Sequence, residues 1–181
     1  HLGDQISVIG AGVVGCLIAR LAGKLPGCRV QLIDSDPGKA TIAALMGVAF
    51  AVPEQAAGEQ DLLIHASGSP TGLATALGLA GFEATVVEAS WFGTQPVSLA
   101  LGENFHAKRL CLRSSQVGQV ATAQRSRWTH QRRMAMVINL LDDPALDALI
   151  SGDRRFADLP QVMAELSQDV TGVLCQRIIY S

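Results

Sequence analysis

Residues 6–18 read ISVIGAGVVGCLI, and the run VQLID that follows ends at Asp34. The apolar residues before Gly10 predict a buried strand, the glycines predict a tight turn, and the residues after them predict a helix. Gly10 permits the turn, Gly12 leaves space for a diphosphate close to the backbone, and Gly15 lets the helix pack on the strand. Because a helix N-terminus has unpaired N–H groups and a partial positive charge, this stretch predicts a dinucleotide-binding turn.

Asp34 lies at the end of the second predicted strand, beside the glycine turn. A carboxylate in that place accepts hydrogen bonds from both hydroxyls of the adenosine ribose and repels the extra phosphate of NADP. Lys39, five positions later, is within reach of the ribose or of the adenosine phosphate, and a solvated lysine at a helix start is the alternative. The sequence therefore predicts a site for NAD, with a ligand-free glycine turn as the alternative.

Short apolar strands alternate with helical segments from the N-terminus to about residue 113. This alternation is typical of an α/β protein with a doubly wound parallel sheet, and the dinucleotide motif predicts the Rossmann strand order 3-2-1-4-5-6. The predicted strands are residues 5–9, 29–33, 48–52, 61–66, 84–89 and 109–113. The predicted helices are residues 13–25, 37–45 and 71–79.

The later residues predict a helical C-terminal appendage with a closing strand, packed on the core. We expect a turn at residues 114–118, a long helix over 119–141, shorter helices over 144–150 and 159–166, and a strand at 177–180. The expected domains are therefore a dinucleotide-binding core, residues 1–118, and a C-terminal part, residues 119–181.

The composition excludes several classes of function. The formal net charge is −2, which argues against a nucleic-acid partner, and the four widely spaced cysteines form no C-x-x-C or Cys/His cluster that would predict a metal site. Residues 62–82 contain no charged side chain but hold a polar turn, so we expect no membrane span. Reduced thiols are typical of the cytoplasm, where we expect this protein. Because the first residue is not Met and the first strand begins at once, we expect a chain cut at its N-terminus.

Polar residues near the ends of later strands are further candidates. His65 lies in an apolar strand, where a packed or backbone-bonded histidine is more common than a catalytic base. Ser67 and Gly68 follow it at the carboxyl end of the strand, where ligands bind in open α/β sheets, and residues 114–116 occupy the same place after the sixth strand. The basic run at 125–133 predicts a solvated or subunit-contact face, with an anion-binding patch as the alternative. We assign no catalytic residue to this chain.

Together these segments resemble the zinc-type alcohol dehydrogenases of the medium-chain dehydrogenase/reductase superfamily, in the branch of the sorbitol and threonine dehydrogenases. DLLIHASGSP resembles the family's D-x-x-x-E-x-x-G segment, with His65 in the place of the acid. The other matching pieces, which together span nearly the whole chain, are VIGAGVVG, LIDSDPGKA, MGVAF, VVEASWFG, LCLRSSQVG, DALISGDRRFADLPQVMAEL and RIIYS.

The resemblance implies a contact for each part of the cofactor. The residues implied at the pyrophosphate are Gly10, Gly12, Val13, Val14 and Gly15, with Asp34 and Lys39 at the adenosine ribose. Those implied toward the far end are Ala66 and Gly68, then Ala89, Ser90 and Ser115 beside the nicotinamide. Arg177 is a weaker match to a basic residue near the pyrophosphate.

The resemblance also implies an oxidoreductase of which this chain is one half. The family's zinc ligands belong to an N-terminal GroES-like domain that this sequence lacks, so zinc and the alcohol, aldehyde or ketone substrate would be bound by that domain. This chain would hold NAD, take part in a homo-oligomer and be inactive alone. Two alternatives are an NAD-sensing regulatory module without catalysis and an interaction protein that kept the fold but lost the ligand.

Overall fold

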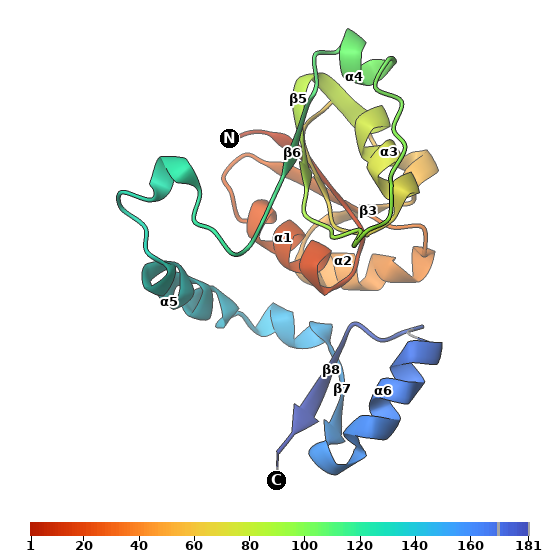
Figure 1. The fold of residues 1–181 in the computed structure, drawn as a ribbon, viewed down its shortest axis with the longest axis vertical. Helices are drawn as coiled ribbons and strands as arrows, with labels where there is room; N and C mark the ends of the chain where they lie inside the picture. Colours follow the sequence, from red (N-terminus) through yellow and green to blue (C-terminus); the bar gives the residue numbers. More distant parts are fainter. Residues whose placement is uncertain (170, 181) are drawn as a thin grey trace. The chain divides into compact units, whose positions relative to one another are not determined.

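The computed structural model describes residues 1–169 and 171–180, and they form two units, His1–Asp142 and the residues from Asp143 onward. Each unit has its own sheet, as Figure 1 shows: six strands in the first and two in the second. The functional division that we predict after residue 118 stays a prediction.

The first unit is built on a parallel sheet in the order β3-β2-β1-β4-β5-β6. This is the predicted Rossmann order, so the predicted fold class is confirmed. Its strands are β1 (Gln5–Ile9), β2 (Arg29–Ile33), β3 (Ala49–Ala51), β4 (Gln60–His65), β5 (Ala80–Glu88) and β6 (Cys111–Ser114). Its first helices are α1 (Val13–Gly23), α2 (Ala40–Met46), α3 (Pro70–Leu79) and α4 (Asn104–Ala107), with short 3-10 turns η1 (Pro37–Lys39) and η2 (Pro53–Gln55).

The core of this unit lies along the central strands. Val8, Leu32, Leu63 and Val86 come from four different strands and are fully buried. α1 packs on β2 and α2, whereas α3 packs on β4 and β5, so the strands are covered as apolar runs of a parallel sheet require. Burying each of these side chains stabilises the fold by about 1.5–3 kcal/mol.

One buried polar cluster interrupts the apolar core. Ser7 on β1 donates a hydrogen bond to Gln60 Oε1 at 3.1 Å and accepts one from Gln31 Nε2 at 2.7 Å. Ser7 and Gln60 are buried, and these bonds offset the cost of removing their polar groups from water. The cluster joins β1, β2 and β4 before their carboxyl ends.

The predicted helix over residues 119–141 is wrong in its first half. A 3-10 turn, η3 (Thr122–Gln124), comes first, and the helix α5 (His130–Leu141) begins only after Thr129, whose side chain accepts the Arg132 amide. Arginine side chains bind carbonyls of the preceding segment: Arg125 donates to Val120 O at 2.9 Å, and Arg133 to Val117 O at 2.8 Å. These bonds satisfy carbonyls in an irregular backbone, so a continuous helix is not needed to pair them.

The second unit contains a strand that the sequence analysis does not predict. β7 (Ile150–Arg155) pairs in parallel with β8 (Cys175–Ile179), and α6 (Leu159–Gln168) lies between them in the chain. The expected helix at 144–150 is a 3-10 turn, η4 (Pro144–Leu149), and a second short turn, η5 (Phe156–Asp158), precedes α6. The predicted closing strand is present, shifted toward the N-terminus, with β7 as its partner.

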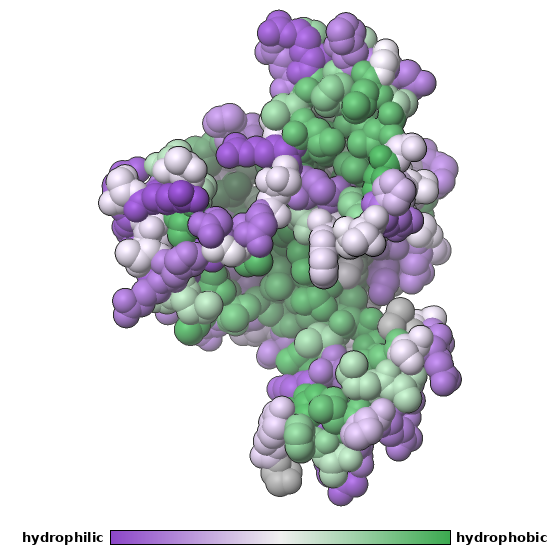
Figure 2. Space-filling view, in the orientation of Figure 1, coloured by the Kyte–Doolittle hydropathy of each residue, from purple (hydrophilic) through white to green (hydrophobic). Residues whose placement is uncertain are grey.

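Apolar residues also reach the surface of both units, as the green areas in Figure 2 show. On α5, Met134, Ile138 and Leu141 are each more than half exposed. None of the helices in the described part of the chain has both the length and the apolar character needed to cross a membrane.

Candidate functional site

The glycine turn between β1 and α1 has a different constraint at each glycine. Gly10 has φ +104°, and a Cβ there would lie 2.8 Å from the Ser67 backbone. At Gly15 an added Cβ would lie 1.8 Å from Gly10 O, which no side chain tolerates. At Gly12, in contrast, a Cβ would meet nothing within 4 Å. The first and third glycines are therefore required by packing, whereas the second faces open space at the N-terminus of α1.

Asp34 is fixed beside this turn by two backbone amides. Its Oδ2 accepts the Ala11 N–H at 2.7 Å, and its Oδ1 accepts the Asp36 N–H at 3.0 Å. Such charge-assisted bonds hold the carboxylate in one orientation. Each oxygen keeps a further lone pair for a ligand hydroxyl.

The charges of Lys39 and Asp34 both act on the thiol of Cys16. Lys39 ends the turn η1, which begins after Asp36 accepts the Gly38 amide at 2.8 Å. Burial raises the pKa of the Cys16 thiol to about 11, against the opposing charge of Lys39. Cys16 is therefore a neutral thiol in the packing of α1, and Lys39 supplies positive charge on this side of the turn.

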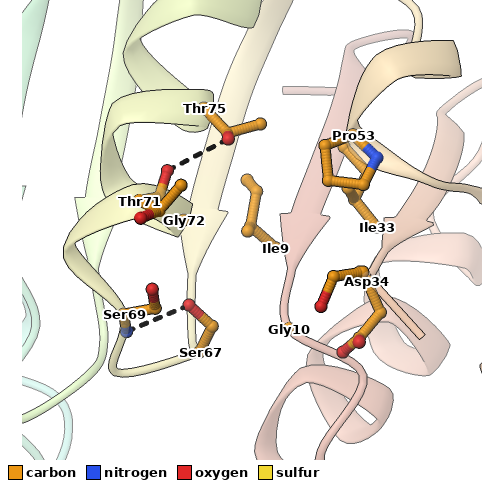
Figure 3. Close-up of a pocket in the computed structure, with 11 residues that line it drawn as sticks. Ile9, Gly10, Ile33, Asp34, Pro53, Ser67, Ser69, Thr71, Gly72 and Thr75 are labelled. Carbon is orange, nitrogen blue, oxygen red and sulfur yellow. Dashed lines mark hydrogen bonds between the residues drawn. The ribbon is translucent and has the colours of Figure 1, made fainter.

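A cavity of about 140 Å³ opens between the ends of β1 and β2 and the start of α3. Figure 3 shows Gly10 and Asp34 on one side and the hydroxyls of Ser67, Ser69 and Thr71 on the other. The full lining is Ile9, Gly10, Ile33, Asp34, Ser35, Pro53, Ser67, Ser69, Thr71, Gly72 and Thr75. It combines apolar walls with hydroxyls and one carboxylate, a composition suited to a nucleoside.

His65 is completely buried at the end of β4, between two polar partners. Its Nδ1 lies 2.7 Å from Glu88 Oε2, and its Nε2 lies 2.6 Å from Ser67 Oγ. Since a carboxylate only accepts, we assign the ring hydrogen to Nδ1, so that Nε2 accepts the serine hydroxyl. His65 and Glu88 are paired residues on neighbouring strands. The resemblance expects an acid at position 65, and the structure instead has a buried histidine there that contacts an acid on β5.

A second cavity, of about 600 Å³, lies at the ends of β5 and β6. Ala89, Ser90 and Ser115 all line it, as do Glu88 and Gln116. The Ser115 amide donates to Glu88 O at 2.7 Å, which continues the pairing of the two strands into this region. The three residues that the family resemblance implies beside the nicotinamide therefore lie around one cavity.

The structure brings most of the predicted site residues to the carboxyl edge of the first sheet. Twelve of them follow the end of a strand or lie in the first turn of the next element: Gly10, Gly12, Val13, Val14, Gly15, Asp34, Lys39, Ala66, Gly68, Ala89, Ser90 and Ser115. Arg177 is different, because it lies on β8 in the second unit, where its guanidinium donates to both carboxylate oxygens of Asp153 at 2.8 Å. Its assignment to a pyrophosphate stays a prediction.

Sequence reasoning missed the part played by Glu88. An acid at the last position of a strand rich in valine is the available signal, but its partner is decided by strand register. Among the described residues, no three His, Cys, Asp or Glu side chains lie together as metal ligands would.

The residues present fit a dinucleotide. The free volume at Gly12 lies against the first turn of α1, whose N-cap has no side chain to occupy the free N–H groups. Such an N-terminus favours phosphate oxygens, and Asp34 stands on the side where a ribose would follow.

Comparison with known proteins gives matches in structure alone. No protein-family model and no curated protein sequence matches this chain. Among solved structures, L-idonate 5-dehydrogenase from Escherichia coli superposes with a TM-score of 0.79 at 19% identity, over 99% of this chain and 51% of that chain. For 2R,3R-butanediol dehydrogenase from Bacillus subtilis the TM-score is 0.76 at 12% identity, over 99% and 52%. For a short chain alcohol dehydrogenase from E. coli in complex with NADH it is 0.74 at 19% identity, over 99% and 52%.

At these identities the likeness concerns the fold. This chain spans about half the length of the structures that it matches. The chain therefore has the fold found in about one half of each of these dehydrogenases.

Proposed function

We propose that this chain is the NAD-binding domain of a zinc-type alcohol or polyol dehydrogenase. The observation that carries the proposal is the open space at Gly12, at the N-terminus of α1, next to Ala11, whose amide fixes the carboxylate of Asp34. The structural likeness to dehydrogenases, one of them holding NADH, supports the same class of reaction.

In this proposal the chain binds and orients the cofactor. The free amides of Val13 and Val14 donate to the diphosphate, and Gly12 lets the diphosphate approach them. Asp34 and Lys39 hold the adenosine ribose, and the turns that carry Gly68 and Ser90 flank the nicotinamide half. When bound, NAD supplies the hydride acceptor for oxidation of an alcohol to an aldehyde or ketone.

Asp34 is proposed to make the site selective for NAD over NADP. Its two oxygens are oriented by backbone amides toward a ribose, and a 2′-phosphate would bring negative charge against them. We expect titration calorimetry to give NADH an affinity at least about tenfold above that of NADPH. Asp34→Ala should lower the affinity for NADH and remove the difference between the affinities for NADH and NADPH.

Asp36→Ala is the matched control for that experiment. It removes an acid two residues away and the bond to the Gly38 amide, but no proposed ribose contact. Equal affinity of the unmodified chain for NADH and NADPH would sink the assignment.

We further propose that the substrate and the catalytic zinc are bound by a separate domain, and that this chain alone has no dehydrogenase turnover. Metal analysis after purification and an assay of NADH formation with polyols test this. One zinc per chain, or turnover by this chain alone, would contradict the division of labour. The proposed homo-oligomer is tested by light scattering on the same sample.

A further inference from the structure

The turns that follow β4 and β5 are joined by a closed ring of hydrogen bonds. His65 contacts Ser67 Oγ through Nε2 and Glu88 through Nδ1. The other oxygen of Glu88 accepts the Ser90 N–H at 2.6 Å, and Ser90 Oγ accepts the Gly68 N–H at 2.9 Å. Gly68 is covalently next to Ser67, so the ring returns to its starting turn.

His65 is the central member of this ring and is sealed from ligands. Its side chain is 0% exposed, whereas that of Glu88 is 14% exposed. Phe92 stacks on the imidazole with ring centroids 5.9 Å apart, and a Cβ added at Gly72 would lie 2.9 Å from Nε2. Because nothing bound in the crevice can touch the imidazole, any effect of His65 on binding must pass through the two turns.

Those two turns lie where the second half of a dinucleotide would be. The glycine turn follows β1 and Asp34 follows β2, so the strand order leaves only the ends of β4, β5 and β6 for the remaining half. Gly68 and Ser90 are on the turns after β4 and β5. A site whose contacting groups are held before the ligand arrives loses less entropy on binding.

We propose that His65 is a positioning residue for the nicotinamide half of the cofactor, acting through the ring that fixes Gly68 and Ser90. This inference rests on the proposed function. It assigns a role to a buried histidine that touches no ligand. It also gives a reason for the polar pair of His65 and Glu88 among apolar strands.

The order Glu88, His65, Ser67 also occurs in hydrolytic triads, but the backbone differs here. A nucleophile turn between strand and helix is strained, whereas among the described residues positive φ at non-glycine positions is confined to Glu59, Glu83 and Arg109. Ser67 Oγ also accepts the Ser69 amide at 3.2 Å, as in an ordinary serine turn. The ring is thus better explained as a support for the two turns.

The test compares NADH with AMP, which lacks the nicotinamide half. His65→Leu breaks the ring from the buried side, and Glu88→Met breaks it from β5 at nearly constant size. In either variant we expect NADH affinity to fall about tenfold. AMP affinity should fall less, because of the ring members only Ser67 lines the cavity suited to a nucleoside. Glu88→Gln should stay within about threefold of the unmodified chain, because the imidazole can adopt its other tautomer and accept from the amide.

Ser7→Ala is the control for a general loss of stability. It removes a buried hydrogen-bonding side chain from the same sheet, outside the ring, so it should lower the unfolding temperature without changing NADH affinity. If His65→Leu does not fold, the two Glu88 variants decide the question.

Unchanged NADH affinity in both ring-breaking variants would overturn the inference, as would equal losses for NADH and AMP. A loss in Glu88→Gln as large as in Glu88→Met would also overturn it, because charge rather than the ring would then be responsible. If the unmodified chain binds AMP and NADH equally weakly at millimolar concentration, the proposed function fails and this inference fails with it.

Discussion

Gly12→Ala should separate binding from folding in this chain. An added Cβ at position 12 meets no atom within 4 Å, and the backbone there is extended, with φ −78° and ψ −177°. An alanine is therefore sterically allowed in the absence of a ligand. Its methyl group would, however, fill the volume proposed for the diphosphate.

The size of each effect follows from local interactions. Alanine is a poorer helix N-cap than glycine by up to about 1 kcal/mol. It also lowers the conformational entropy of the unfolded chain, which stabilises the folded chain by about 0.4–1 kcal/mol and offsets this loss. The free energy of unfolding should thus change by less than about 1 kcal/mol. A methyl group that holds the diphosphate away from the amides of Val13 and Val14 removes two charge-assisted hydrogen bonds, about 3 kcal/mol together, or about a 100-fold loss of NADH affinity.

Gly15→Ala is the matched comparison, three residues further along the same turn. Its Cβ would lie 1.8 Å from Gly10 O, far inside the 3.0 Å below which Cβ contacts are not observed. Gly10 O is a backbone atom and a Cβ is fixed rigidly to its own backbone, so neither can rotate away. The turn and α1 must therefore separate, and we expect a destabilisation of about 3 kcal/mol or more. Urea unfolding followed by circular dichroism measures both variants, and calorimetry with NADH measures binding by the folded ones.

Either of two results would contradict these expectations. Gly12→Ala that binds NADH as tightly as the unmodified chain would show that the diphosphate does not occupy this volume. Gly15→Ala with unchanged stability would show that the close contact between α1 and the turn is not a constraint on the fold.

Two further predictions concern titratable groups. Burial raises the pKa of the Cys16 thiol to about 11. Iodoacetamide at about pH 8 should therefore modify the exposed Cys111 and Cys175 but modify Cys16 only after unfolding, which mass spectrometry measures. Equal labelling of the three thiols in the native state would contradict this. In the second unit, the hydrogen bond from Arg177 holds the pKa of Asp153 below its ordinary 3.8. The pair therefore stabilises β7 and β8 above pH 3.8. This contribution is lost as the pH falls through the lower pKa that Asp153 has in the folded chain. Relative to the intrinsic exchange rate at each pH, amide protection in β8 should be lower at neutral pH in Asp153→Asn than in the unmodified chain, and the two chains should become alike at acid pH. Equal protection at neutral pH would rule the pair out as a stabiliser.

The strand order could be predicted because the local sequence of each central strand predicts that strand. β1 and β2 are short apolar runs that end just before Gly10 and Asp34, and the dinucleotide motif favours the order 3-2-1-4-5-6 for such units. β7 could not be predicted in this way. Its sequence ISGDRR has a glycine and three charged residues, and it is a strand because β8 pairs with it from 24 residues away.

Some residues of the candidate site could likewise be predicted from the local sequence, and others could not. Gly10, Gly12 and Gly15 can be recognised from their spacing, because the close contact of Gly15 with Gly10 O lies within the turn itself. Glu88 is constrained by His65, which lies 23 residues earlier and on another strand. Register between parallel strands leaves no local signal, so an interaction that depends on it appears only in three dimensions.

The strand order also determines when the cofactor site can exist during synthesis. β1 pairs with β2 and β4, and the wall opposite Gly10 is made by Ser67. A nascent chain therefore exposes the glycine turn first, but the second wall arrives only with residues beyond β4, and the ring behind it only with β5. Pairing between such distant segments is slow. Under the proposed function, NAD stabilises this fold only once the residues through β5 have been made, and fragments that end before β4 have no complete site for it to bind.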